Sequence, residues 1–119
     1  MDEVDKFNDS REKMNDKMLA QDNLVLKRLF NLYTTTYKEG SLYSRTKDLI
    51  GLIASMVLRC NDCIKYHLEK CHNFGYITDQ MFEAYSVENV VGGSIVIPHL
   101  RRAVEFWKVL ENKKNIKRD

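Results

Sequence analysis

Two cysteines and a histidine are concentrated in residues 60–67, whose sequence is CNDCIKYH. Cys60 and Cys63 stand three residues apart, a spacing at which two thiols can close a small disulfide or bind a metal ion. His67 follows Cys63 by four residues, one helical turn on, so its imidazole can hydrogen-bond the thiol directly or through one water. The segment therefore predicts either redox chemistry or metal binding.

A helix start must fall between the two cysteines if they form a disulfide. Inside a regular helix their Cβ atoms would be about 5 to 6 Å apart, which is too far for an S–S bond. Asn61 is a suitable N-cap and predicts a helix over residues 62–73. Cys63 then lies in the first turn, where free N–H groups and the helix dipole stabilise a thiolate. We therefore predict Cys63 as the nucleophile and His67 as its base.

Zinc binding is the alternative chemistry for the same residues. Thiol and imidazole ligands recur in the series Cys60, Cys63, His67 and Cys71. Cys60 and Cys71 would be roughly 16 Å apart along a helix, which is too far for two ligands of one ion. Cys71 is therefore expected to be a small buried residue. A three-ligand site of Cys60, Cys63 and His67 stays open, but we expect neither a metal nor another cofactor.

Length and charge indicate one small domain. A chain of 119 residues can build a core, and its remaining apolar surface favours assembly with partner subunits. A net charge of +2 argues against nucleic-acid binding. The acidic N-terminus lacks a secretory signal, and the longest apolar stretch, residues 49–58, is too short to span a membrane. We therefore expect a cytoplasmic protein, in which three cysteines do not form a structural disulfide framework.

The cysteines must be positioned by helices, because apolar residues recur at spacings of three and four. This periodicity predicts an all-α fold, a compact antiparallel domain of about five to six helices over residues 21–112. Residues 1–20 are a charged extension, helical or loosely ordered, and residues 113–119 are a basic, solvated tail. Helices are expected at 22–38, 44–59, 62–73, from 78 to the Gly-Gly break at 92–93, and 94–111, with N-caps at Asp22, Thr78 and Ser94. The helix over 44–59 is apolar nearly all round and should be buried.

The order of these motifs resembles the AhpD-like alkylhydroperoxidases of the carboxymuconolactone decarboxylase superfamily. The resemblance covers about residues 24–110 and rests on a Gly-Ser-Leu turn at 40–42, the helix start TKDLI at 46–50, CxxCxxxH at 60–67, GYIT at 75–78 and Gly-Gly at 92–93. It implies an all-α homo-oligomer, commonly trimer-based. It also implies a peroxidase that cycles through a Cys–Cys disulfide.

The same resemblance implies a role for each site residue. By position, Cys63 resembles the peroxidatic cysteine, Cys60 the resolving thiol and proton donor, and His67 a member of the proton relay. Asp48 occupies the position of the family's relay glutamate. Because Asp48 is about 18 Å from Cys60 along a straight helix, its carboxylate should reach Cys63 only through a chain bend or from a neighbouring subunit.

Three hypotheses for function follow. The leading one is a thiol-dependent peroxidase or disulfide oxidoreductase that takes a peroxide and is reduced by a dithiol or a disulfide reductase. The second is a lactone decarboxylase of the same superfamily, against which the thiol pair counts because that reaction needs only acid–base groups. The third is a non-enzymatic helical oligomer that senses redox state or binds a metal.

Overall fold

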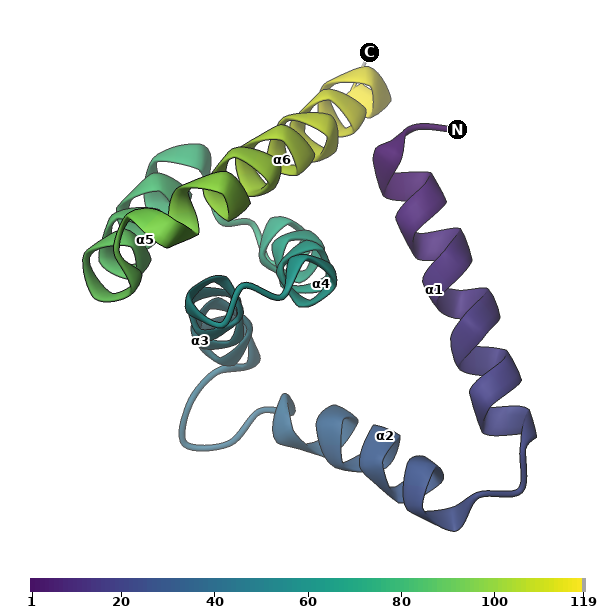
Figure 1. Cartoon of the computed structure of the whole chain (residues 1–119). Coiled ribbons are helices and arrows are strands. Elements are labelled where there is room, and N and C mark those ends of the chain that lie inside the picture. The colour runs from purple at the N-terminus through teal and green to yellow at the C-terminus, as the bar shows by residue number, and fades with distance from the viewer. Residues whose placement is uncertain (119) are drawn as a thin grey trace.

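The computed structural model describes residues 1–118, which fold into six α-helices and a short 3₁₀ helix (Figure 1). In chain order these are α1 (Glu3–Ala20), α2 (Leu24–Thr36), α3 (Ser44–Val57), α4 (Asn61–Asn73), α5 (Thr78–Gly92), η1 (Ser94–Val96) and α6 (Ile97–Arg118). The predicted all-α fold of about five to six helices is confirmed. Asp119, the end of the predicted basic tail, lies outside the described residues.

The core is formed by the last four α-helices. Helix α4 packs against both α3 and α6, and α5 also packs against α3. Leu52 and Met56 of α3 are fully buried, as are Leu68 of α4 and Phe106 of α6. The expectation that α3 is buried all round is wrong, because Ile50 on its outer face is 54% exposed. This chain alone does not cover that face of α3.

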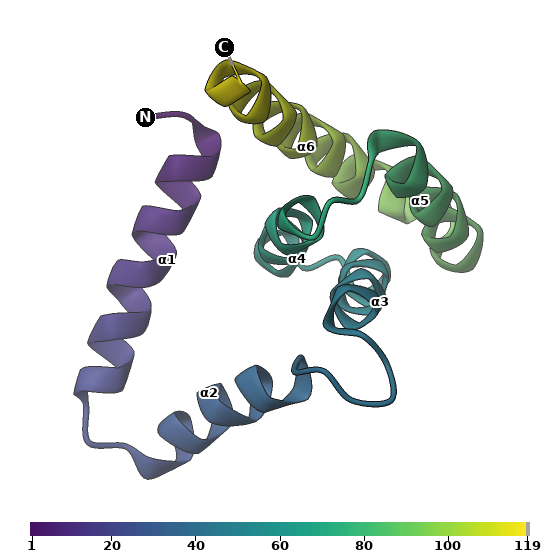
Figure 2. The same ribbon diagram turned by 180° about the vertical axis from the view of Figure 1, so that it is seen from behind.

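Helices α1 and α2 extend from the core as two arms (Figures 1 and 2). The start of α1 is anchored, since Val4 is buried and the ring of Phe7 packs edge-on against Phe106 at 5.9 Å between centroids. Helix α2 buries no residue of its own. No helix within residues 1–118 is long and apolar enough to cross a membrane.

The solvated tail predicted over residues 113–119 is placed too early in the chain. Helix α6 continues to Arg118, and the ammonium group of Lys113 forms salt bridges with Asp2 and Asp5 of the first helical segment. Lys113 therefore fastens the later part of α6 to the start of α1, and these two segments lie side by side in Figure 2.

Several helix starts differ from the predicted ones by one to three residues. Asn23, rather than Asp22, caps α2 by accepting a hydrogen bond from the backbone N–H of Leu26. Thr78 is the first residue of α5, and its hydroxyl accepts a hydrogen bond from the indole N–H of Trp107 at 3.0 Å. Ser94 opens η1 instead of capping the last helix. For Asp22 and Thr78, a neighbour with better cap geometry or a tertiary partner of the side chain decides the boundary.

The turn between α3 and α4 is short and tightly bonded. Arg59 adopts a left-handed backbone conformation with a φ of 62°. Its N–H bonds to the carbonyl of Met56, and the N–H of Cys60 bonds to the carbonyl of Ser55, both at 3.0 Å. These two bonds are the pattern of a Schellman turn, which closes a helix without extra residues. The turn fixes where the first cysteine enters α4.

Candidate functional site

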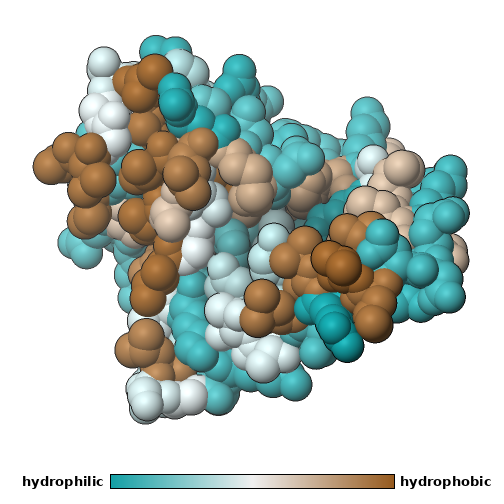
Figure 3. Space-filling model, turned by 60° about the horizontal axis from the view of Figure 1, so that its bottom comes forward, coloured by the Kyte–Doolittle hydropathy of each residue, from teal (hydrophilic) through white to brown (hydrophobic). Residues whose placement is uncertain are grey.

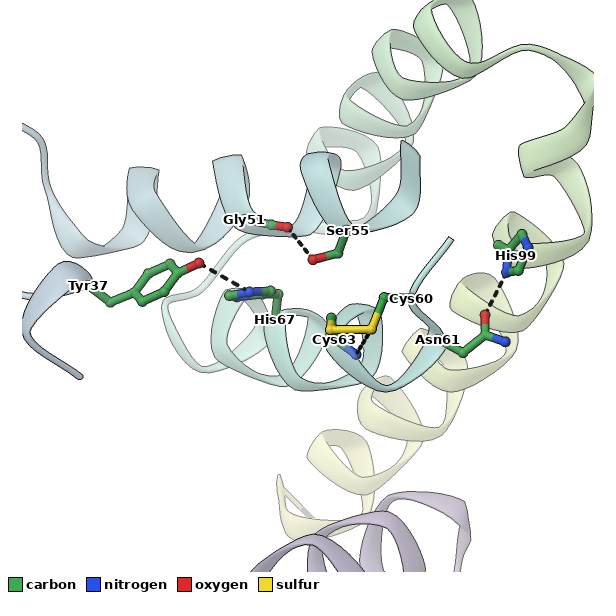
Figure 4. Close-up of a disulfide and its surroundings, with 8 residues drawn as sticks. All are labelled: Tyr37, Gly51, Ser55, Cys60, Asn61, Cys63, His67 and His99. Atoms are coloured by element: carbon green, nitrogen blue, oxygen red, sulfur yellow. Dashed lines mark hydrogen bonds between the residues drawn. A yellow bond between two sulfur atoms is a disulfide. The ribbon is translucent and has the colours of Figure 1, made fainter. Parts of the chain in front are cut away.

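Cys60 and Cys63 form a disulfide at the N-terminus of α4 (Figure 4). Cys60 is the N-cap residue, in an extended conformation, and its sulfur accepts a hydrogen bond from the N–H of Cys63 at 3.3 Å. Their Cα atoms are 5.3 Å apart, within the range that a disulfide requires. The pair thus straddles the helix start as predicted.

Asn61 was expected to cap this helix but is its first residue instead. Its side-chain oxygen lies 2.7 Å from Nδ1 of His99 on α6 and is therefore engaged away from the helix end (Figure 4). This contact leaves the cap position to Cys60 and ties the cysteine segment to α6.

His67 and Asp48 form a buried pair. His67 Nδ1 lies 2.9 Å from Asp48 Oδ1, and both side chains are more than nine-tenths buried. The chain bend that the sequence required is the turn between α3 and α4. Asp48 lies about 14 Å before the end of α3 and His67 about 9 Å after the start of α4, so the antiparallel hairpin brings them level to within about 5 Å. Asp48 therefore contacts the histidine within one subunit.

Tyr37, the residue that ends α2, reaches the other nitrogen of His67. Its hydroxyl lies 3.3 Å from Nε2, and Figure 4 shows the ring pointing from α2 toward the imidazole. Burial, followed by the negative charge of Asp48 and the nearby Tyr66, raises the pKa of the Tyr37 hydroxyl. The Tyr37 hydroxyl is therefore protonated at neutral pH and can donate a hydrogen bond.

Gly51 of α3 provides the space for this contact. A Cβ atom at this position would lie 2.7 Å from the Tyr37 hydroxyl and 2.8 Å from two ring atoms of His67. Such distances are well inside van der Waals contact, so only glycine lets both rings approach the α3 backbone.

A cavity of about 1390 Å³ opens in front of these groups and is lined by residues of α1, α2, α3 and α4. Cys63, His67, Tyr37 and Asp48 all contribute to its wall, together with Ser55. Aromatic and basic side chains line the remainder, among them Phe7, Phe30, Tyr66, Arg11, Lys65 and Lys70. The cavity gives a substrate access to the exposed Cys63.

Cys71 lies apart from this chemistry. It is fully buried, as predicted, and burial followed by the negative charge of Asp48 raises its pKa to about 12. Its thiol is therefore almost entirely un-ionised at neutral pH. Within residues 1–118, no group of three histidine, cysteine, aspartate or glutamate side chains is arranged to hold a metal ion.

The structure thus brings together Cys60, Cys63, His67 and Asp48 in one region, and adds Tyr37 and Gly51, which sequence reasoning missed. In the sequence, Tyr37 lies near the end of the helix predicted over residues 22–38, where an aromatic residue is most simply part of an apolar packing face. Gly51 did carry a signal, because a glycine inside a helix costs roughly 1 kcal/mol relative to alanine and so indicates a close approach.

The fold and the site place the chain in one class of proteins. These are all-helical proteins with a Cys-x-x-Cys disulfide at a helix start and a buried His–Asp pair beside it. The chain belongs to the carboxymuconolactone decarboxylase family, whose sequence profile matches residues 23–106. The resemblance inferred from the order of the motifs is therefore confirmed.

Solved structures agree with this assignment. Two crystal structures of one Thermotoga maritima protein are 46% and 49% identical to this chain, with TM-scores of 0.90 and 0.89. The first covers 96% of this chain and 97% of that one, the second 92% and 96%. That protein is described as a member of the same family with a possible part in an antioxidative response. A family member from Legionella pneumophila, 17% identical over 92% of this chain and 98% of that one with a TM-score of 0.83, shares the fold. No curated protein matches the sequence.

Proposed function

We propose that this chain is a thiol-dependent peroxidase, or more broadly a disulfide oxidoreductase, that cycles between the Cys60–Cys63 dithiol and its disulfide. The observation that carries the proposal is the disulfide itself, which joins a helix-capping cysteine to a cysteine on the wall of an open cavity. The antioxidative description of the Thermotoga maritima relative points in the same direction.

In the proposed cycle, the Cys63 thiolate attacks one oxygen of a peroxide and the O–O bond breaks. The attacked oxygen stays on sulfur as a sulfenic acid, and the other leaves as an alcohol or water after taking up a proton. The Cys60 thiol then attacks the sulfur of Cys63, which forms the disulfide and releases water. A dithiol donor or a disulfide reductase supplies the two electrons and two protons that restore both thiols.

Local geometry supports the division of roles between the cysteines. Cys63 is the third residue of α4, where unpaired backbone N–H groups and the helix dipole favour a thiolate. Cys60, half-buried at the cap position, already lies within bonding distance of it. Asp48 and His67 provide a buried base with a charged partner that stabilises its protonated form.

The experiment follows consumption of hydrogen peroxide and tert-butyl hydroperoxide with dithiothreitol as electron donor. Wild type should consume both reagents catalytically, and Cys63→Ser should lose this activity entirely. Cys60→Ser should still form a sulfenic acid in a single turnover, trapped by dimedone and detected by mass spectrometry. Cys71→Ser serves as the matched control, because that thiol is buried and outside the cavity. Full activity in Cys63→Ser would overturn the proposal.

The same variants separate the alternative functions. A lactone decarboxylase depends on acid–base groups, so Cys63→Ser would keep lyase activity with a lactone substrate. A metal-binding protein would contain stoichiometric zinc when purified under reducing conditions, and the metal would block alkylation of Cys60 and Cys63.

We further propose that copies of this chain assemble into a homo-oligomer. Exposed apolar side chains occur on α2 (Val25, Leu29, Leu32) and on α5 (Val87, Val90, Val91). Figure 3 shows such side chains gathered in two separate areas of one face. Two separate apolar areas on one chain favour a closed ring such as a trimer, or an assembly built from trimers. Sedimentation velocity should show an oligomer that Leu29→Glu weakens, and a wild-type monomer at micromolar concentration would contradict this.

A further inference from the structure

Both ring nitrogens of His67 are engaged, and this limits how the histidine can receive a proton. Nδ1 faces the carboxylate of Asp48, which only accepts hydrogen bonds, so Nδ1 carries a hydrogen. In a neutral imidazole Nε2 is then the acceptor, and it takes the hydrogen bond of the Tyr37 hydroxyl. The one basic position of His67 is therefore covered by Tyr37.

We propose that Tyr37 is the proton-relay residue between the thiol of Cys63 and His67. The inference rests on the proposed thiol chemistry of the same site. Cys63 and Tyr37 both line the cavity, so water molecules in the cavity can form a hydrogen-bonded chain from the thiol to the tyrosine oxygen. This route replaces the direct contact between Cys63 and His67 that their spacing alone suggests.

Protons and charges balance in this relay, and no charge is left on the tyrosine. The S–H bond of Cys63 breaks, and the chain of water molecules carries the proton to the oxygen of Tyr37. Tyr37 at the same time gives its own hydroxyl proton to Nε2 of His67. Cys63 becomes a thiolate, Tyr37 is again a neutral phenol, and the carboxylate of Asp48 stabilises the imidazolium.

Backbone contacts fix Tyr37 for this role. The ammonium group of Lys47 on α3 donates hydrogen bonds to the carbonyls of Thr36 and Lys38, at 3.0 and 2.8 Å. These two carbonyls flank Tyr37 in the sequence, so the end of α2 is fastened to α3 on both sides of the tyrosine. Gly51 then leaves the space in which hydroxyl and imidazole meet.

The test measures thiol reactivity, which does not depend on any peroxide. The full chain is reduced, and the rate of Cys63 alkylation by iodoacetamide is followed across pH by peptide mass spectrometry. In Tyr37→Phe the alkylation curve should move up by about one pH unit, which lowers the rate at neutral pH about tenfold. Gly51→Ala, which keeps the hydroxyl but displaces it from the imidazole, should produce the same shift.

The matched control is Tyr76→Phe. This variant also loses one hydroxyl and one hydrogen bond, which Tyr76 donates to the carbonyl of Arg45 at 3.1 Å. Tyr76 is not among the residues that line the cavity. Its alkylation curve should coincide with that of wild type. A wild-type curve for Tyr37→Phe would overturn the relay, as would an equal shift in Tyr76→Phe.

Failure of the relay and failure of the proposed function give different results. If wild type consumes no peroxide but Tyr37→Phe shifts the alkylation curve, the relay stands and the peroxidase proposal fails. If peroxide consumption is normal in wild type and the curve of Tyr37→Phe is unchanged, the peroxidase stands and the relay fails.

Discussion

The buried pair of Asp48 and His67 should contribute a measurable coupling energy to folding. The two side chains are 8% exposed or less, and Nδ1 and Oδ1 are 2.9 Å apart, a distance typical of a hydrogen bond with an ionised partner. Such bonds contribute about 1.5 to 3 kcal/mol. We therefore expect a coupling energy of about 2 kcal/mol from a double-mutant cycle of Asp48→Asn, His67→Gln and the double variant.

The assay is urea unfolding followed by far-ultraviolet circular dichroism, with dithiothreitol present so that every variant has the same cysteine state. One protein concentration is used throughout, because assembly of subunits would otherwise contribute to the apparent stability. The coupling should persist when salt is raised to about 0.5 M, since a buried pair is poorly screened.

The molecule offers a matched control in the ion pair of Lys27 and Asp22 on the α2 arm. Its atoms are 3.3 Å apart, but the side chains are 47% and 102% exposed. Exposed pairs contribute about 0 to 1 kcal/mol, and salt screens them. If the coupling of Asp48 and His67 is no larger than that of this exposed pair, the reasoning from burial and distance is refuted.

Three other predictions follow from burial and backbone geometry. Because burial raises the pKa of Cys71 to about 12, iodoacetamide should label only two of the three thiols in the folded, reduced protein, and labelling of Cys71 at the same rate would contradict this. Glu88 is 0% exposed and neither carboxyl oxygen has a hydrogen-bond partner among the residues that the structure describes, and burial raises its pKa above the ordinary value of 4.5. The folded state therefore favours the protonated acid, and stability is lost as the pH rises above about 4.5; Glu88→Gln should remove this loss in urea unfolding at several pH values, and identical pH profiles would refute it. Arg59→Gly should raise the free energy of unfolding by about 0.5 kcal/mol, because glycine relieves the left-handed strain but adds unfolded-state entropy. By contrast, Ala54→Gly in the last turn of α3 should lower it by up to about 1 kcal/mol.

Local patterns in the sequence were sufficient for the cysteine segment. The spacing of Cys60, Cys63 and His67 determines which residues share a helix face, and helix periodicity follows from residues three and four apart. The required bend before Cys60 could also be inferred, because a disulfide between these positions excludes a continuous helix. These features depend on neighbours in the chain and not on how the helices pack.

Tyr37 could not be found in this way. Its partner His67 is thirty residues away, and the contact depends on how the end of α2 is fastened to α3. An aromatic residue on a helical apolar face looks the same whether it fills a core or faces a cavity. For the same reason the apolar residues of α3 predicted a buried helix, whereas Ile50 is exposed in the single chain. Sequence alone does not distinguish a face covered by the same chain from one that another copy can cover.

Asp48, a short acidic residue, shares one face of α3 with two other small residues. Gly51 and Ser55 follow Asp48 at spacings of three and seven, so the three lie along one side of the helix, facing α4. With no side chain at Gly51, the imidazole of His67 lies against the α3 backbone itself. At that separation the short carboxylate already reaches Nδ1 at 2.9 Å, and the extra methylene of a glutamate would have to be accommodated in a buried site. The shorter acid therefore does not weaken the contact with the histidine, because Gly51 lets the imidazole lie against the α3 backbone.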